Sequence, residues 1–345
     1  MEVPSIFLNR ILSEMVQKNG SDLHLASGSL PMARMGGQFA SLSGHDIISA
    51  EVISKIAETF LSQEEIVKLK EAKSLIVVKN ISNFRFRVNV FYQKGLLAVS
   101  FHHIPGVIKN FSDLGLDEIC GNFLKAPSGL LVIAGAYNSG KTTTATSFIE
   151  ELNKTKALNI ITIEDPIEYL FVSKLSFITQ RQVGTDVNTV SEALDYCLSE
   201  DVDAVYINEI KDGHSLGSAM QKIFDLASGN CLVVLEINAD SSERVLEKIL
   251  IGVSESMPPE AARYNLADIL IGVLAQKLVK RRGGGMVLAN EILLNNEAVK
   301  SLIREGKIHQ LESVMQTSRR QGMIRMDKSL DSLVESGEIR REDIN

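Results

Sequence analysis

The segment from Gly129 to Thr142 limits the possible fold of this chain more than any other feature. It starts with an unbroken apolar run and continues into GAYNSGKT, which spans Gly135 to Thr142 and matches the pattern G-x-x-x-x-G-K-[ST]. Glycines allow the backbone to wrap closely around an anion, and the start of a following helix favours negative charge. The spacing therefore predicts a phosphate-binding loop between a buried strand and a helix. An ordinary glycine-rich turn is the simpler alternative, but the flanking pattern argues against it.

Strand and helix signals alternate over the middle of the chain. Apolar runs at 130–134, 159–164, 204–208 and 231–237 predict strands, and the stretches at 141–152, 189–198, 216–226 and 242–250 have helical periodicity. Continuous apolar strands that alternate with helices are typical of a largely parallel sheet covered on both faces. We therefore expect an α/β domain over residues 109–294, followed by a helical C-terminal region over residues 295–345.

The first 108 residues have a different pattern. Helical periodicity at 5–19 and 50–72 precedes strand signals at 75–78, 84–92 and 95–101. In the strand at 84–92, apolar residues alternate with Arg85, Arg87 and Asn89, so the two arginines share the face opposite the apolar side chains. This predicts a small α+β domain over residues 1–108.

Composition argues against several classes of protein. The chain has 36 basic and 43 acidic residues and a net charge of −7, which makes a nucleic-acid partner a poor expectation. Its three cysteines form neither a disulfide framework nor a C-x-x-C pair, which favours a reducing compartment. The longest apolar runs fall well short of the ~20 residues of a membrane span, and the N-terminus lacks the pattern of a signal peptide. We expect a cytoplasmic protein.

Carboxylates stand at the ends of two predicted strands. Glu164 ends the run at 159–164, and Glu209 follows the run at 204–208. Ligands of open α/β sheets bind at the carboxyl ends of the strands, so both side chains could meet a nucleotide there. Hydrolysis needs Mg²⁺, for which the Thr142 hydroxyl and a carboxylate are suitable ligands, and a group that positions water. The same pattern also fits acidic residues that only solvate the ends of strands.

Taken together, these segments resemble the type II/IV secretion ATPase superfamily, and within it the type IV pilus retraction ATPases PilT and PilU. The resemblance runs from about residue 11 to residue 339. It is carried by SDLHL at 21–25, RFRVN at 85–89, TIEDPIE at 162–168, QRQVG at 180–184 and AVKSLIRE at 298–305. Each motif alone is modest, but all of them occur in the order of the family.

This resemblance implies a PAS-like N-terminal domain, a RecA-like P-loop ATPase domain and a helical C-terminal region. It also implies a ring-shaped homohexamer that binds ATP and Mg²⁺ and drives pilus retraction in twitching motility. The implied location is cytoplasmic, peripheral at the bacterial inner membrane. The implied partners are a PilC-like platform protein of that membrane and, as a further candidate, a PilT or PilU paralogue.

The resemblance also assigns roles to residues. Glu164 would position or activate water, and Glu209 with Thr142 would hold Mg²⁺. The implied nucleotide-binding residues are Gly135, Asn138, Ser139, Gly140, Lys141, Thr142 and Thr143, with Arg85 and Arg87 offered to nucleotide bound by a neighbouring subunit.

The chain departs from the family at residues expected to support turnover. Two histidines of the family are missing, since no histidine lies between His214 and His309, and the matching stretches read SGNC at 228–231 and EIN at 236–238. Lys211 and His102 replace arginines, and an arginine that stabilises a transferring phosphate contributes about 10³–10⁵ in rate. Two hypotheses stay open: a motor with weakened or partner-dependent hydrolysis, and an auxiliary ring subunit that binds ATP with negligible turnover.

Overall fold

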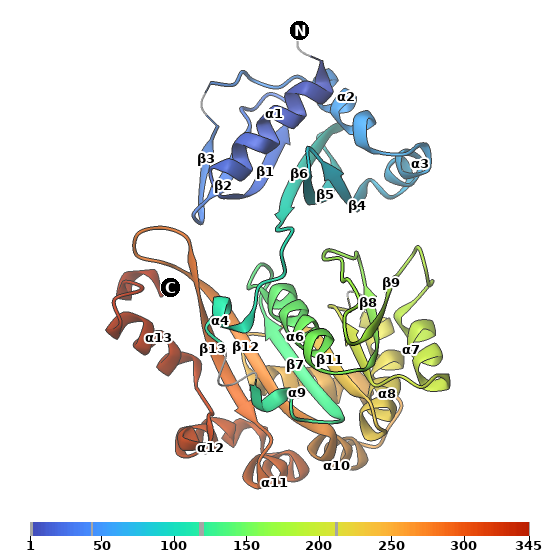
Figure 1. Ribbon diagram of the computed structural model, residues 1–345, viewed down its shortest axis with the longest axis vertical. Coiled ribbons are helices and arrows are strands. Elements are labelled where there is room, and N and C mark those ends of the chain that lie inside the picture. The colour runs from blue at the N-terminus through green and yellow to red at the C-terminus, as the bar shows by residue number, and fades with distance from the viewer. Residues whose placement is uncertain (1–2, 43, 117–120, 211–212, 345) are drawn as a thin grey trace. The chain divides into compact units, whose positions relative to one another are not determined.

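The computed structural model describes residues 3–42, 44–116, 121–210 and 213–344. The chain divides into two compact units (Figure 1). The first consists of residues 1–107 with 283–286, and the second of residues 108–282 with 287–345. In the described part of the chain, no helix has both the length and the apolar character needed to cross a membrane.

The first unit is an antiparallel sheet packed against helices. The strand order is β3-β2-β1-β6-β5-β4. The strands are β1 (Gly20–Ala26), β2 (Met32–Met35), β3 (Gln38–Ser41), β4 (Ser74–Ile81), β5 (Phe84–Gln93) and β6 (Leu96–Ile104). The helices are α1 (Pro4–Gln17), α2 (Ala50–Phe60) and α3 (Gln63–Ala72). In β5 the predicted alternation holds, because Phe86, Val88 and Val90 are buried between the more accessible Arg85, Arg87 and Asn89.

The predicted helical stretch at 50–72 forms two helices because Ser62 begins a new one. The Ser62 hydroxyl accepts a hydrogen bond from the Glu65 N–H, and the Glu65 carboxylate accepts one from the Ser62 N–H. This reciprocal pair satisfies two backbone N–H groups at the start of α3, and it separates α3 from α2.

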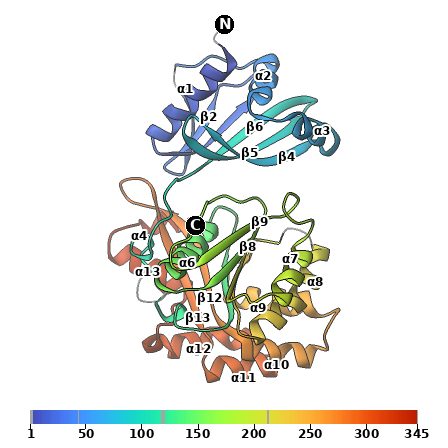
Figure 2. The same ribbon diagram turned by 45° about the vertical axis from the view of Figure 1, so that its right-hand side comes forward.

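The second unit is built on a seven-stranded sheet with the order β13-β12-β7-β11-β10-β8-β9. From β12 to β9 in this order, every strand pairs in parallel with its neighbour. The strands are β7 (Gly129–Gly135), β8 (Asn159–Glu164), β9 (Phe177–Gln182), β10 (Ala204–Ile207), β11 (Leu232–Ile237), β12 (Leu270–Lys280) and β13 (Met286–Leu294). Figure 2 shows β8 beside β9 and β12 beside β13.

Helices cover both faces of this sheet. The side chains of α4 (Phe111–Leu114) and α6 (Lys141–Thr155) pack with Leu131 and Ile133 of β7 on one face. On the other face, Leu130 and Val132 meet helices that follow the later strands. These are α7 (Val190–Ser199), α8 (Gly213–Ser228), α9 (Ser242–Val253), α10 (Pro259–Ile269) and α11 (Glu297–Glu305). This is the α/β architecture predicted from the sequence.

The last part of the chain is helical, as expected, in short pieces. After α11 come α12 (Leu311–Thr317) and α13 (Met326–Glu335), with 3-10 turns at Ile308–Gln310, Arg319–Gln321 and Arg341–Asp343. Within residues 308–321 the helical structure is divided into three pieces.

Some elements were not predicted. The two prolines at 258–259 read as a connection, but Pro259 is the first residue of α10, where the missing N–H costs nothing. The segment Leu266–Ala275, apolar except for Asp268, crosses from α10 into β12, so its periodicity fits neither element. Strands β1 to β3, β9, β12 and β13 were also absent from the prediction.

Candidate nucleotide-binding site

The predicted phosphate loop lies between β7 and α6, as the sequence pattern required. A Cβ at Gly135 would stand 2.2 Å from the Ser139 Oγ and 2.5 Å from the Gln276 carbonyl oxygen, so no side chain fits there. Gly140, the residue before α6, has φ +90°, and Asn138 has φ +60°. These left-handed conformations curl the loop tightly, which glycine and asparagine tolerate best. The geometry therefore leaves the backbone of residues 135–140 free to line a small anion.

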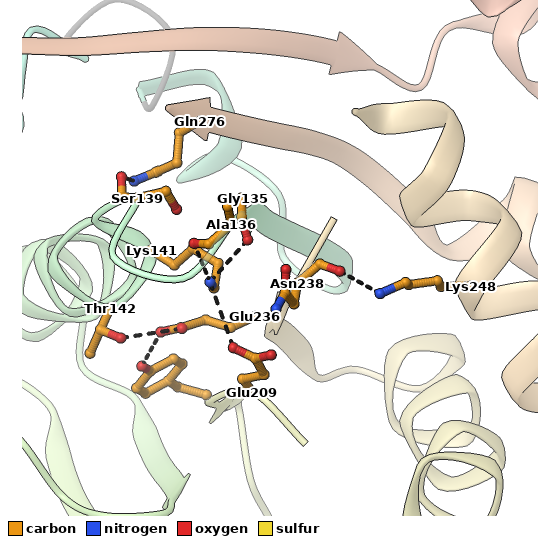
Figure 3. Close-up of polar contacts among 11 residues, drawn as sticks. Gly135, Ala136, Ser139, Lys141, Thr142, Glu209, Glu236, Asn238, Lys248 and Gln276 are labelled. Carbon is orange, nitrogen blue, oxygen red and sulfur yellow. Dashed lines mark hydrogen bonds and ion pairs between the residues drawn. The ribbon is translucent and has the colours of Figure 1, made fainter. Parts of the chain in front are cut away.

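Lys141 points its ammonium group into this loop (Figure 3). Its Nζ donates hydrogen bonds of 3.0 Å to the carbonyl oxygens of Gly135 and Ala136 and lies 3.6 Å from the Glu209 Oε2. The side chain is only 6% exposed, so its charge acts at short range in a poorly solvated place. A phosphate group placed in the loop would be an alternative partner for the same ammonium.

Thr142, the first-turn neighbour of Lys141, contacts a carboxylate that the sequence analysis did not select. Its Oγ1 donates a 3.2 Å hydrogen bond to the Glu236 Oε2, and the Tyr206 hydroxyl donates one of 2.5 Å to the Glu236 Oε1. Glu236 is 3% exposed, and its burial raises the pKa of its carboxyl group to about 7. The site thus holds two carboxylates, Glu209 and Glu236, around one lysine and one threonine.

Glu164 ends β8 and is completely buried. Its Oε1 accepts hydrogen bonds from the Thr162 hydroxyl at 2.7 Å and from the Gln180 amide at 3.0 Å, while its Oε2 has no partner. Burial raises the pKa of Glu164 to about 7, although hydrogen bonding, that of Thr162 and Gln180 above all, lowers it. A buried carboxyl with one oxygen unoccupied and a pKa near neutrality is suited to proton transfer.

The strand ends that bear Glu164 and Glu209 are joined by Asn208. The Asn208 N–H donates to the Ile163 carbonyl at 3.1 Å, and the Asp165 N–H donates to the Asn208 side-chain oxygen at 3.1 Å. The Asn208 side chain therefore links the loop after β8 to the loop after β10.

The remaining predicted loop residues surround Lys141. Ser139 is buried, its carbonyl accepts a 2.9 Å hydrogen bond from the Gln276 side chain, and its hydroxyl has no partner. Thr143 lies in the first turn of α6, and its carbonyl oxygen accepts hydrogen bonds from the hydroxyl groups of Thr146 and Ser147. The buried Gln276 oxygen is also unpartnered. Unsatisfied buried polar atoms on both sides of the loop fit a site that a polar ligand completes.

These residues fit a nucleotide with Mg²⁺. Within the described residues, no group of three or more histidine, cysteine or acidic side chains could hold a metal ion by itself. Mg²⁺ usually takes one or two protein oxygens and completes its shell with phosphates and water. Thr142 and Glu209 supply hard oxygen ligands of that kind beside the phosphate loop.

Other predicted residues lie elsewhere. Arg85 and Arg87 are on β5, in the first unit, opposite Ile104 and His102 of β6. His102 places its Nδ1 2.9 Å from an Asp22 carboxylate oxygen. Asn238, in the stretch where the resemblance implies a histidine, is exposed, and its carbonyl oxygen accepts a hydrogen bond from Lys248. Lys211 lies outside the described residues.

With this geometry in view, comparison with known proteins identifies the family. Residues 108–335 match the family model described as "Type II/IV secretion system protein". This chain belongs to the type II/IV secretion system protein family. The motif-based assignment made from the sequence is confirmed.

Relatives within the type II/IV secretion family match almost the whole chain. The chain is 31% identical to the type IV pilus retraction ATPase PilT of Pseudomonas aeruginosa, over 97% of this chain and 96% of PilT. It is 29% identical to PilU of the same organism, over 97% of this chain and 86% of PilU. A crystal structure of the retraction motor PilT with bound ADP superposes with a TM-score of 0.82 at 33% identity, covering 97% of this chain and 95% of that one. The predicted fold class is thereby confirmed.

One residue of the site escaped the sequence analysis. Glu236 lies in an apolar strand, and its segment was matched only to the stretch in which the resembling family has a histidine. The available signal was a lone acidic residue at the carboxyl end of β11, the same signal that selected Glu164 and Glu209.

Proposed function

We propose that this protein is a hexameric ATP-driven motor for type IV pilus retraction, with hydrolysis that is weakened or depends on a partner. The observation that carries the proposal is the convergence of the buried Lys141 with the partly exposed Thr142 and Glu209 at a phosphate loop, at the carboxyl ends of parallel strands. The full-length similarity to PilT and PilU, and the ADP bound in a PilT crystal structure, support pilus retraction and adenine nucleotide.

In this proposal the loop from Gly135 to Gly140 holds the phosphates with its backbone, and Ser139 and Thr143 support it. Lys141 exchanges the carbonyls of Gly135 and Ala136 for the β- and γ-phosphates. Thr142 and Glu209 hold Mg²⁺, which neutralises charge on the phosphates when it is bound. Glu164, when ionised, accepts a proton from the attacking water.

The assembly is part of the same proposal. We take the functional unit to be a ring-shaped homohexamer in which Arg85 and Arg87 reach nucleotide in a neighbouring subunit. Its partners would be a PilC-like platform protein at the inner membrane and a PilT or PilU paralogue, and its location the cytoplasmic side of that membrane. The division into residues 1–108, 109–294 and 295–345 belongs to this proposal as well.

A second function has its own support in the sequence. The absence of histidine between residues 214 and 309, and of arginine between residues 181 and 244, removes groups that could stabilise charge during phosphate transfer. An auxiliary ring subunit would bind ATP to set the shape of the ring but would hydrolyse it negligibly.

Steady-state hydrolysis of Mg·ATP by the purified protein tests both functions. The motor predicts turnover clearly above that of Lys141→Ala and Glu209→Ala, with ATP binding lost in the lysine variant. Turnover equal to that of both variants, with ATP still bound by the wild type, would exclude an autonomous motor and support the auxiliary subunit. Failure of the wild type to bind ATP would contradict both.

A further inference from the structure

Glu236 is a buried carboxylate that the proposed roles leave unused. It is the second-last residue of β11, next to β7, whose end forms the phosphate loop. At 3% exposure it cannot be a solvated strand end. Burying a carboxylate is costly unless hydrogen bonds or opposite charge compensate, so its presence calls for an explanation.

Both oxygens of this carboxylate receive O–H groups. Tyr206, wholly buried on the neighbouring β10, donates to Oε1 at 2.5 Å, and Thr142 donates to Oε2 at 3.2 Å. The tyrosine therefore fixes the carboxylate, and the fixed carboxylate orients the threonine hydroxyl. Figure 3 shows the Glu236 side chain reaching toward Thr142, with Lys141 and Glu209 close to it in this view.

The direction of the threonine hydrogen bond matters for a cation. A hydroxyl group has one proton and two lone pairs, and it binds a metal ion through a lone pair. Because Glu236 accepts the hydrogen bond that Thr142 donates, the lone pairs of Oγ1 stay available on its other side. A hydrogen-bond donor in place of the carboxylate would occupy a lone pair of Oγ1. The hydroxyl proton would then point toward the cation.

We propose that Glu236 is a positioning residue for the divalent cation: it accepts the hydrogen bond of the Thr142 hydroxyl, so that the lone pairs of the Thr142 oxygen face Mg²⁺. The inference rests on the proposed function, since it needs Mg²⁺ with nucleotide at this loop. Tyr206 holds Glu236 in place, and the carboxylate adds a negative charge beside the cation. Groups that orient metal ligands contribute about 10- to 100-fold to metal affinity in other proteins.

The test is equilibrium binding of a fluorescent ATP analogue, measured with Mg²⁺ and with a chelator in its absence. The measured quantity is the factor by which Mg²⁺ tightens nucleotide binding. Glu236→Gln removes the negative charge and leaves one accepting oxygen for the hydroxyl groups of Thr142 and Tyr206, at nearly constant shape. We expect this factor to fall about 10- to 100-fold. Binding without Mg²⁺ should be kept or tightened, because a negative charge near the phosphates is lost.

Two further variants make the result specific. In a Thr142→Ala background, Glu236→Gln should reduce the Mg²⁺ factor little further, because the carboxylate acts through the missing hydroxyl. Tyr206→Phe leaves the carboxylate in place but releases it, and should reduce the factor in the same direction by a smaller amount. This variant carries the test if Glu236→Gln does not fold.

Glu150→Gln is the matched control. Glu150 is a buried carboxylate on α6, the helix that also carries Thr142, and it is paired with Lys174 and Asn153. Its variant should keep the wild-type Mg²⁺ factor. An unchanged factor in folded Glu236→Gln, or a full additional loss in the Thr142→Ala background, would overturn the inference while the proposed function stands. A wild type that binds no nucleotide under either condition would overturn both.

Discussion

At the scale of single residues, Glu164 is a carboxyl group whose ionisation is opposed by its surroundings. Its pKa is raised from 4.5 to about 7, mainly by burial. Below pH 4.5 both the folded and the unfolded chain hold the proton, so stability is unaffected. Between pH 4.5 and 7 the unfolded chain releases a proton that the folded chain keeps, and the folded state loses stability as pH rises.

This gives a prediction for Glu164→Gln, which has no proton to release. A pKa difference of about 2.5 corresponds to at most about 3 kcal/mol, fully developed above pH 7. The unfolding free energy of the variant relative to the wild type should therefore rise by about 2–3 kcal/mol between pH 5 and pH 8. Chemical denaturation at both values measures it. Parallel pH curves for the two proteins would show that Glu164 is not held neutral by burial.

Proton transfer by Glu164 predicts a different outcome for turnover. Because only the ionised form can accept a proton, the rate of hydrolysis at saturating Mg·ATP should rise with pH through about 7 in the wild type. Glu164→Gln should lose about 10²–10⁴ in rate and this rise with it, while it still binds ATP. Loss of ATP binding in the variant would assign Glu164 a structural role instead.

At the scale of elements, the phosphate loop depends on close packing against β12. Gly135→Ala would force its Cβ within 2.5 Å of the Gln276 carbonyl oxygen, so the loop backbone must move. We expect nucleotide affinity to fall by about 10²-fold, because displacements of about 1 Å have effects of that size, while the fold is retained. Isothermal titration with ATP and a thermal melt measure the two effects. Gly121→Ala, where an added Cβ meets nothing within 4 Å, is the control and should bind normally.

The same scale shows which parts of the structure were accessible to sequence reasoning. The strand–loop–helix at residues 129–155 was predictable because the apolar run and the spacing of the glycines and lysine after it are contiguous in the sequence. Strand β12 was not, because Leu266–Ala275 is apolar except for Asp268 and crosses a helix–strand boundary. Glu236 was missed because its function depends on Thr142 and Tyr206, which are 94 and 30 residues away in the chain. Hydrophobic periodicity predicts which face of a helix or strand is buried, but it does not predict which distant residue a side chain contacts.

At the scale of the whole molecule, the proposed ring predicts that one site draws residues from two subunits. Arg85→Ala with Arg87→Ala in one chain leaves the phosphate loop intact, and Lys141→Ala leaves the arginines intact. Each variant alone should hydrolyse ATP at least about tenfold more slowly than the wild type. Mixed rings should recover part of the activity, because neighbours supply what the other lacks. Mixtures no more active than the separate variants would contradict sharing of arginines between subunits.

The pairing of strand ends by Asn208 has a mechanical consequence. Asn208 accepts from the Asp165 N–H and donates to the Ile163 carbonyl, so the backbone beside Glu164 is tied to the residue before Glu209. These two hydrogen bonds transmit a displacement of either loop to the other loop. We therefore expect Glu164 and Glu209 to move together. Whatever shifts the loop after β10 resets the alignment of Glu164 at the same moment. A glycine at this position would have no side chain to transmit that force.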